Sequence, residues 1–259
     1  MHSNQLAQYS SVIRKLSKEQ LHGSKPLPEE LRVSSRADVE VWYAPFEYIN
    51  PHARLVIVGI TPGRTQMLNA LRECRHQLDI GASYENALKS AKQTAAFSGA
   101  MRPNLVGLLD RIGLTRFLSI TSCSALFSDR SDLVHTTSVL RNPVFVGGEN
   151  YNGNPSLVRH PLLKQELVDG FGQDVAALPN AVFVPLGDKV SQALFYLADR
   201  GLIASDRILE GLPHPSGANA ERIAYFLGTK ARSDLSNKTS PEKLDQARLN
   251  LSNRVAALA

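Results

Sequence analysis

The sequence has few cysteines and no long apolar run, and both features exclude classes of protein. Only Cys74 and Cys123 occur among 259 residues, and neither forms a Cys-x-x-Cys pair or lies at metal-ligand spacing from histidines. This usage argues against a disulfide framework and a structural zinc site, and it indicates a reducing compartment. The first six residues contain no apolar signal-peptide core, and no stretch approaches roughly 18 uninterrupted apolar residues. We therefore expect a cytoplasmic protein without a membrane partner.

The overall composition is that of a globular protein with a modest excess of positive charge. Hydrophobic residues make up 43% and charged residues 20% of the chain, which excludes wholesale disorder and a fibrous repeat. The 29 Lys and Arg residues against 24 Asp and Glu residues give a net charge of +5. That balance is compatible with a polyanionic partner such as DNA, single- or double-stranded, without requiring one.

Apolar periodicity alternates between strand and helix patterns along the chain. We expect strands over residues 39–43, 54–59, 117–123, 181–186 and 207–211. We expect helices over residues 4–19, 67–78, 83–92, 104–112, 161–171, 188–199, 220–227 and 241–257. Residues 124–160 show no clean period, which predicts a long loop. The alternation predicts an α/β fold with three α/β/α layers around a central, mostly parallel four-stranded sheet.

Two segments combine a buried strand with a turn rich in glycine and proline. The first is Leu55–Gly63, and the second is Gly211–Asn219, which ends in a cluster of His, Ser and Asn. In an open parallel sheet, such strand-end loops converge on one edge, where ligands bind and backbone N–H groups meet anions. The two loops are therefore the first candidate site.

The motifs and their order along the chain resemble the uracil-DNA glycosylase superfamily. The matching elements are Gly59-Ile-Thr-Pro-Gly63, Phe97-Ser-Gly99, Ile120-Thr-Ser122, Val184-Pro-Leu-Gly187 and His214-Pro-Ser-Gly-Ala-Asn219. The first and last elements look most like the single-strand-selective monofunctional and mismatch-specific branches. The resemblance implies a glycosylase-like domain over residues 41–232, flanked by a helical extension over 1–40 and a linker and helix over 233–259.

The resemblance also implies a chemistry and a role for each matching residue. Such enzymes flip a base out of the DNA stack into a pocket and hydrolyse its N-glycosidic bond, without a metal or organic cofactor. His214 would donate to the base as negative charge develops, and Thr61 would stand at the position that orients water. The residues that would line, stack on or read the base are Gly59, Ile60, Pro62, Gly63, Phe97 and Ser122. The residues that would hold DNA phosphate are Pro215, Ser216, Gly217, Asn219 and Arg64.

Two positions depart from the family pattern. Thr61 stands where these branches carry Asn and where the most active branch carries Asp, and a hydroxyl offers no charge to an oxocarbenium-like centre. Ser122 cannot reproduce the paired donor and acceptor of an Asn amide that distinguish uracil from cytosine. The polar residues nearby that could substitute are Gln66, Asn104, Glu149, Asn150, Tyr151 and Asn152, together with Arg64.

Each candidate also has a purely structural interpretation. Thr61 fits a turn hydroxyl, Ser122 a small packing residue, and Asn219 a helix cap. Phe97 fits core packing as well as stacking. We therefore keep three hypotheses: a monofunctional DNA glycosylase of weak or altered specificity, a module that binds nucleic acid or a modified base without chemistry, and a hydrolase of free nucleosides or nucleotides.

Overall fold

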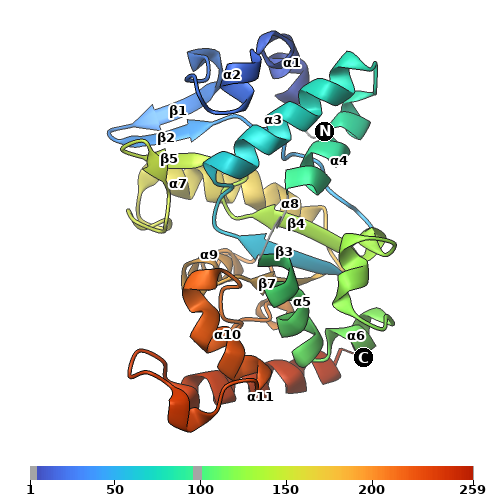
Figure 1. The fold of residues 1–259 in the computed structure, drawn as a ribbon, viewed down its shortest axis with the longest axis vertical. Coiled ribbons are helices and arrows are strands. Elements are labelled where there is room, and N and C mark those ends of the chain that lie inside the picture. Colours follow the sequence, from blue (N-terminus) through green and yellow to red (C-terminus); the bar gives the residue numbers. More distant parts are fainter. Residues whose placement is uncertain (1–4, 96–100, 259) are drawn as a thin grey trace. The chain divides into compact units, whose positions relative to one another are not determined.

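The computed structural model describes residues 5–95 and 101–258 of this mixed α/β protein (Figure 1). The chain divides into two compact units and crosses between them several times. The first unit holds residues 5–49, 60–95 and 137–174, and the second holds residues 50–59, 101–136 and 175–258. The two candidate loops therefore belong mainly to different units.

The first unit contains a four-stranded antiparallel sheet that the sequence did not predict. Its strands, in spatial order, are β1 (Arg32–Arg36), β2 (Val39–Trp42), β5 (Val144–Val146) and β6 (Glu149–Asn150). In the central pair, Glu40 lies opposite Phe145 and Val41 opposite Val144. Residues some hundred positions apart in the chain thus lie side by side in this sheet.

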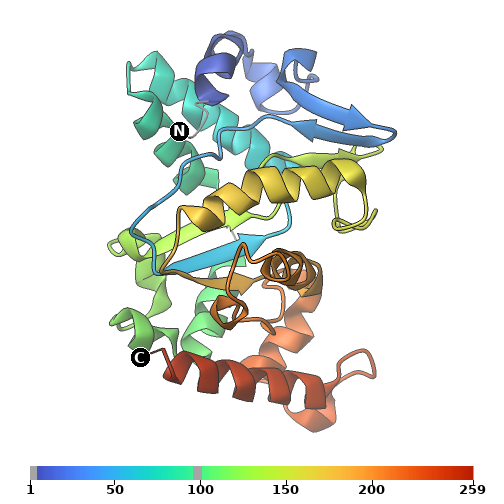
Figure 2. The same cartoon turned by 180° about the vertical axis from the view of Figure 1, so that it is seen from behind.

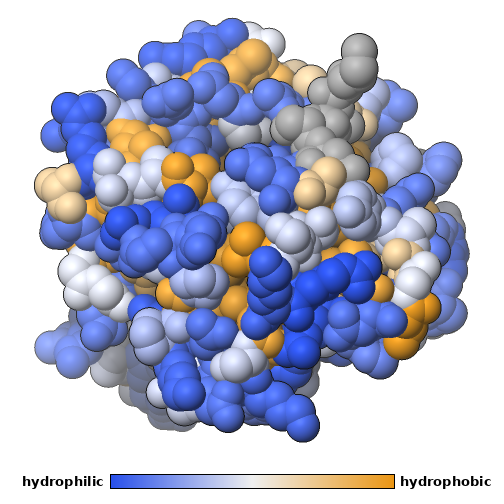
Figure 3. Space-filling view, turned by 90° about the horizontal axis from the view of Figure 1, so that it is seen from above, coloured by the Kyte–Doolittle hydropathy of each residue, from blue (hydrophilic) through white to orange (hydrophobic). Residues whose placement is uncertain are grey.

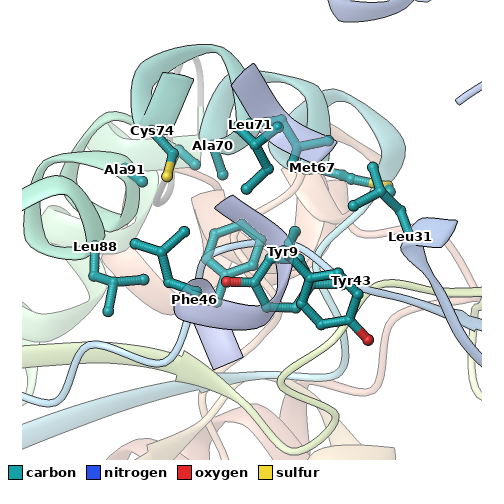
Figure 4. Close-up of a cluster of buried hydrophobic side chains, with 14 of the residues drawn as sticks. Tyr9, Leu31, Tyr43, Phe46, Met67, Ala70, Leu71, Cys74, Leu88 and Ala91 are labelled. Atoms are coloured by element: carbon teal, nitrogen blue, oxygen red, sulfur yellow. The ribbon is translucent and has the colours of Figure 1, made fainter. Parts of the chain in front are cut away.

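Helices enclose the hydrophobic core of the first unit, which Figure 4 shows in close-up. Tyr9 and Tyr43 stack there with their ring centroids 4.0 Å apart. The helices that lie wholly in this unit are α1 (Gln5–Lys15), α2 (Lys18–Leu21), η1 (Glu29–Leu31), α3 (Arg64–Asp79), α4 (Tyr84–Ala95), α7 (Pro161–Gln165) and the π-helix η4 (Glu166–Phe171). The helix α8 (Gly172–Ala176) continues from η4.

The second unit is built on a parallel three-stranded sheet in the order β4-β3-β7. Its strands are β3 (Leu55–Gly59), β4 (Val134–Ser138, the last two residues of which belong to the first unit) and β7 (Val182–Pro185). Residues 55 to 58 of β3 are completely buried, as expected for a strand covered on both faces. The strand predicted over 207–211 is reduced to a single bridge between Ile208 and Phe183.

Helices and short 3₁₀ turns complete the second unit. Seen from behind in Figure 2, α11 is a long helix that lies beside α10. The helices are α5 (Met101–Arg111), α6 (Leu114–Leu118), η2 (Cys123–Phe127), η3 (Ser131–Leu133), α9 (Asp188–Ala198), η5 (Ser205–Arg207), η6 (Gly217–Asn219), α10 (Ala220–Leu227), η7 (Arg232–Asp234) and α11 (Pro241–Ala256).

The predicted strand over 117–123 is wrong, and so is the predicted long loop over 124–160. Residues 114–118 form α6, which ends at Ser119 in the left-handed conformation, with φ of 56°. The strand beside β3 is β4, inside the stretch that was expected to be a loop. Hydrophobic periodicity does not indicate β4, because two of its buried residues are polar. His135 is 2% exposed and accepts from the Asn50 N–H, and Thr137 donates to Asp174.

Three smaller differences concern helix ends. The helix expected over 4–19 is divided in two, because Ser17 caps α2 with its side chain. The helix expected over 161–171 passes into a π-helix and extends to residue 176. The helix expected over 188–199 ends one residue earlier, at Ala198, and its N-terminal cap is Gly187, with φ of 96°.

On the face drawn in Figure 3, the hydrophobic side chains of the described residues appear in small groups between hydrophilic ones. Ile80 and Leu249 are the most exposed of the large apolar side chains described, at 64% and 57%. Across residues 5–95 and 101–258, none of the helices is both long and apolar enough to cross a membrane.

Candidate functional site

The first loop connects β3 to α3, and hydrogen bonds of its backbone groups hold it in place. Gly59 ends β3 in the second unit, and residues 60–64 belong to the first. Pro62 is buried, and Gly63 caps α3, with its N–H donating to Oε1 of Gln66 at 2.9 Å. The carbonyl oxygen of Ile60 accepts from the Leu140 N–H at 3.0 Å. The loop thus lies beside the segment that follows β4.

Thr61 ties this loop to the segment between β4 and β5. Its hydroxyl donates to the carbonyl oxygen of Asn142 at 3.1 Å and accepts from the Val144 N–H at 3.1 Å. A threonine hydroxyl has one proton to donate, and Thr61 gives that proton to the main chain. Its observed contacts are therefore those of a structural hydroxyl that joins two loops.

Asn142 is a polar residue beside the loop that the sequence analysis missed. It is 6% exposed, and its side-chain Oδ1 is buried without a hydrogen-bond partner among the residues that the structure describes. Such atoms are uncommon and call for a reason, such as a site for water or a ligand. The Asn-Pro step at 142–143 was the available signal, but the surrounding segment had been interpreted as a loop.

The N-terminus of α3 is already occupied by protein groups. Asn150 accepts from the Arg64 N–H through Oδ1 at 2.8 Å, and a Cβ atom at Gly63 would lie 3.6 Å from that oxygen. The Arg64 side chain donates to the Gly148 carbonyl oxygen at 2.8 Å, and its guanidinium lies 4.5 Å from the centre of the Phe145 ring. Asn150 and Gln66 are thus helix-capping residues, and Arg64 is held above Phe145.

The second loop presents His214 in a defined orientation. His214 is half-buried, and its Nδ1 accepts from the backbone N–H of Ser216 at 3.2 Å. Because Nδ1 accepts, the proton of the neutral ring is assigned to Nε2. Burial lowers the pKa of His214, which favours this neutral form. The loop therefore presents a neutral imidazole whose Nε2–H can donate.

Contacts within the second unit fix the position of this loop. The Asn104 side chain on α5 donates to the Pro215 carbonyl oxygen at 2.9 Å. Asn104 was one of the polar residues considered as a substitute in the site, and it instead supports the backbone beside His214. At the start of the loop, Gly211 has φ of 114°, a conformation that favours glycine.

The residues after His214 form a short polar turn before α10. Asn219 donates from its side chain to Oγ of Ser216 at 3.3 Å, and Arg222 donates to Oδ1 of Asn219 at 3.1 Å. Gly217 is exposed, with open space where a Cβ would stand. Arg222 thus adds a cation to the predicted phosphate-binding segment, a feature that helical periodicity alone did not indicate.

Ser122 lies in a cap rather than in a strand. Its hydroxyl donates to Oδ2 of Asp110 at 2.9 Å and accepts from the Ser124 N–H at 3.2 Å at the start of η2. The other carboxylate oxygen of Asp110 accepts from the Cys123 N–H at 2.7 Å. Phe97, the predicted stacking residue, lies outside the described residues.

The predicted residues thus form two groups. Thr61 is grouped with Asn142 and Arg64 in the first unit, while His214 is grouped with Pro215, Asn104 and the 216–219 turn in the second. Within the part of the chain that the structure describes, no cluster of three or more His, Cys, Asp or Glu residues is arranged to hold a metal ion.

Comparison with known proteins found one relative of similar length. The chain is 34% identical over 207 residues to a protein of Bacillus subtilis (strain 168) named "Uncharacterized protein YoxB", and the match covers 79% of this chain and 81% of that protein. No family model and no solved structure matches the chain.

Proposed function

Since the chain belongs to the same family as YoxB of Bacillus subtilis, a relative whose name states no activity, we propose a function from this chain's own residues. The protein is a uracil-DNA-glycosylase-like enzyme that binds a flipped or single-stranded base in DNA and hydrolyses its N-glycosidic bond. Its specificity differs from that of a strong uracil glycosylase, because Thr61 and Ser122 replace the expected Asn residues.

One observation carries this proposal: the Ser216 N–H donates to Nδ1 of His214 and leaves Nε2–H as the donor. Cleavage of an N-glycosidic bond places negative charge on the departing base. A neutral imidazole N–H, half-buried and fixed in orientation, stabilises that charge without reorganisation during the reaction. The lowered pKa of His214 keeps the donor neutral at physiological pH.

Asn142, in the first unit, is a second polar group for which we propose a role in binding a base or water, independently of the His214 loop. It follows β4 and lies against Thr61, and its carboxamide combines a donor with a buried acceptor that has no hydrogen-bond partner in the described chain. A carboxamide offers the paired hydrogen bonds needed to read a pyrimidine edge or to orient water. Thr61 would then act by positioning Asn142 rather than by touching water itself.

The test uses the purified full-length protein with single- and double-stranded DNA containing uracil, hypoxanthine, xanthine or hydroxymethyluracil, followed by alkali cleavage of abasic sites. We expect cleavage at one or more of these bases. His214→Ala should reduce the rate by about 10²- to 10³-fold, the usual effect of removing one such donor. His52→Ala, at an exposed histidine, is the matched control and should leave the rate unchanged.

The same experiment separates the two other hypotheses. The contacts of Thr61 and Ser122 favour a module that binds without catalysis. Both hydroxyls donate their protons to protein groups and not to a substrate or to water. DNA binding without an abasic product from any base would establish that module and exclude the enzyme. Binding of free nucleosides that does not weaken with salt, without DNA binding, would indicate a nucleoside hydrolase.

A further inference from the structure

The first unit contains a cavity of about 210 Å³ at the start of α3, and His214 is not among the residues that line it. Two aromatic side chains line it, Trp42 on β2 and Phe145 on β5, together with Leu27 and Met67. Met67 is also part of the hydrophobic core, where Figure 4 shows it near Leu31. The cavity therefore has an apolar floor and at least one aromatic wall.

Two carboxylates at this cavity are held in place by neighbouring donors. Oε2 of Glu40 accepts from Nε1 of Trp42 at 3.1 Å, and its Oε1 accepts from Arg32 at 3.2 Å. Arg32 also forms an ion pair of 2.5 Å with Glu29. Each oxygen of an ionised carboxylate has two lone pairs, so Glu40 can still accept from a ligand. The indole and the acid thus form one fixed unit.

Arg64 supplies a donor to the same cavity. It lines the cavity and stacks on Phe145, while one of its nitrogens donates to the Gly148 carbonyl oxygen. A guanidinium carries five N–H donors, so donors remain for a ligand. The cavity consequently combines aromatic surface, a carboxylate acceptor and a cationic donor.

This combination excludes several classes of ligand. Glu29 and Glu40 line the cavity together with Arg64, and Arg32 forms ion pairs with both acids. The acidic and basic groups therefore balance, and a ligand with a full charge of either sign is repelled by some of these groups as it is attracted by others. A neutral flat heterocycle with N–H donors on one edge and acceptors on another remains compatible with all three charged groups.

We propose that this cavity binds a guanine base. Guanine presents adjacent N–H donors to a carboxylate and O6 and N7 acceptors to an arginine, and its ring stacks on aromatic side chains. A water molecule occupies about 30 Å³ in the liquid, so the cavity has room for roughly seven waters, or for one bicyclic base. The base can belong to a single strand or to a free nucleotide, and the site does not depend on glycosylase activity.

Trp42 is the only tryptophan of the chain, so its fluorescence reports directly on this cavity. The full-length protein is titrated separately with the 5′-monophosphates of guanosine, adenosine, cytidine and thymidine. We expect the guanine nucleotide to change Trp42 fluorescence at concentrations at least about tenfold lower than the other three. Equal affinity for all four nucleotides, or no change with the guanine nucleotide at millimolar concentration, would overturn the proposal.

Two variants test the residues in the proposal. Glu40→Gln keeps an acceptor for Trp42 but removes the charge, and should weaken guanine binding about tenfold or more. Leu27→Phe should also weaken it by reducing the cavity, and a thermal melt establishes that each variant is folded. Glu30→Gln, at an exposed acid that does not line the cavity, is the matched control. Unchanged affinity in folded Glu40→Gln would contradict the proposal.

The source of the base is distinguished by comparing oligothymidine with and without one central guanine. Tighter binding of the guanine-containing strand than of the free monophosphate supports a subsite for nucleic acid. The reverse order supports a nucleotide site. Loss of abasic product in the glycosylase assay affects neither result, since the titration measures Trp42 alone.

Discussion

The backbone N–H of Ser216 donates to Nδ1 of His214 across 3.2 Å, within one turn of the chain. This bond assigns the tautomer of the imidazole, because a nitrogen that accepts carries no proton. Burial lowers the pKa of the same ring. Local geometry and solvation therefore favour the same species, a neutral histidine that donates from Nε2.

The first prediction is a pH profile. If neutral His214 is the working form, protonation at low pH changes the ring and breaks its bond to Ser216. Since burial lowers the pKa below the ordinary 6.5, the rate should rise from acidic pH and pass half of its plateau value below pH 6.5. Single-turnover rates of base release between pH 4.5 and 8.5 measure this. A half-maximal rate reached only above pH 6.5 would point to another titrating group.

The second prediction concerns Thr61. Thr61→Val removes both hydrogen bonds to the 142–144 segment, and we expect it to lower the free energy of unfolding by about 2 kcal/mol. Thr61→Ser retains the hydroxyl and should stay within about 1 kcal/mol of the native protein. Thr65→Val, at an exposed position of α3, is the control.

Urea denaturation with a common slope measures these differences. An unfolding free energy for Thr61→Val equal to that of Thr65→Val would show that the two bonds contribute nothing. A folded Thr61→Val protein with impaired base release would support the positioning of Asn142 by this hydroxyl.

The third prediction concerns the start of the His214 loop. Gly211 has φ of +114°, and a Cβ there would stand 3.1 Å from Cβ of Ala247 on α11. Gly211→Ala should therefore destabilise the protein by about 1 to 3 kcal/mol through backbone strain and the contact. Gly170→Ala is the control, because its Cβ would meet no described atom within 4 Å.

A double variant separates the two causes. Ala247→Gly in the Gly211→Ala background removes the contact but not the strain, so it should recover only part of the lost stability after correction for Ala247→Gly alone. Thermal melts of the four proteins provide the comparison. Full recovery would mean that the positive φ costs nothing.

The fourth prediction follows from a buried lysine. Lys92 on α4 is 5% exposed, and its Nζ donates to the carbonyl oxygens of Phe46 and Tyr48 at 3.0 and 2.7 Å. Burial is the main cause that lowers its pKa from 10.5 to about 7; the neighbouring Arg141 lowers it further, while Asp174 and Glu47 act in the opposite direction. The folded protein thus gives up this proton far more readily than the unfolded chain.

The consequence for stability has a definite sign. Between pH 7 and 10.5 the unfolded chain binds a proton that the folded chain lacks, so the free energy of unfolding should rise with pH. The contribution of this one group is at most about 1.4 kcal/mol per pH unit. Below pH 7 Lys92 is protonated in both the folded and the unfolded chain, so it no longer makes the free energy of unfolding depend on pH.

Lys92→Met should remove this slope, although loss of the two hydrogen bonds will also lower stability at every pH. The slopes between pH 7 and 10, from urea denaturation, are therefore compared rather than the absolute values. Lys89→Met, at an exposed lysine of the same helix, should retain the native slope. Equal slopes in all three proteins would contradict an uncharged Lys92.

Some elements were predictable because their sequence signal is local. β3 is a run of apolar residues that is buried on both faces, and α11 begins after a Ser cap with Pro at its first position. β4 was not predictable in the same way. His135 and Thr137 are polar but buried, and their partners Asn50 and Asp174 are far away in the sequence. A periodicity argument cannot anticipate polar groups that are satisfied by distant residues.

The same distinction between local and distant contacts applies to the residues of the candidate site. The Gly-Pro turns and the His214 segment could be located from residue types and spacing, because tight turns depend on local backbone preferences. The role of the Thr61 hydroxyl could not be predicted from the sequence, since its hydrogen-bond partners lie some eighty residues away. The same holds for Asn150, which caps α3 from β6.

The amino-acid order alone thus predicted an α/β protein, its longer helices, the strands β2, β3 and β7, and two loops rich in glycine and proline. These properties follow from short-range periodicity and turn preferences, which act over a few residues. The fold determined which strand lies beside β3, which proton His214 carries, and which acids and aromatic rings surround one cavity. Those outcomes depend on contacts between residues distant in the chain, where packing and hydrogen bonding select one arrangement among many that local preferences allow.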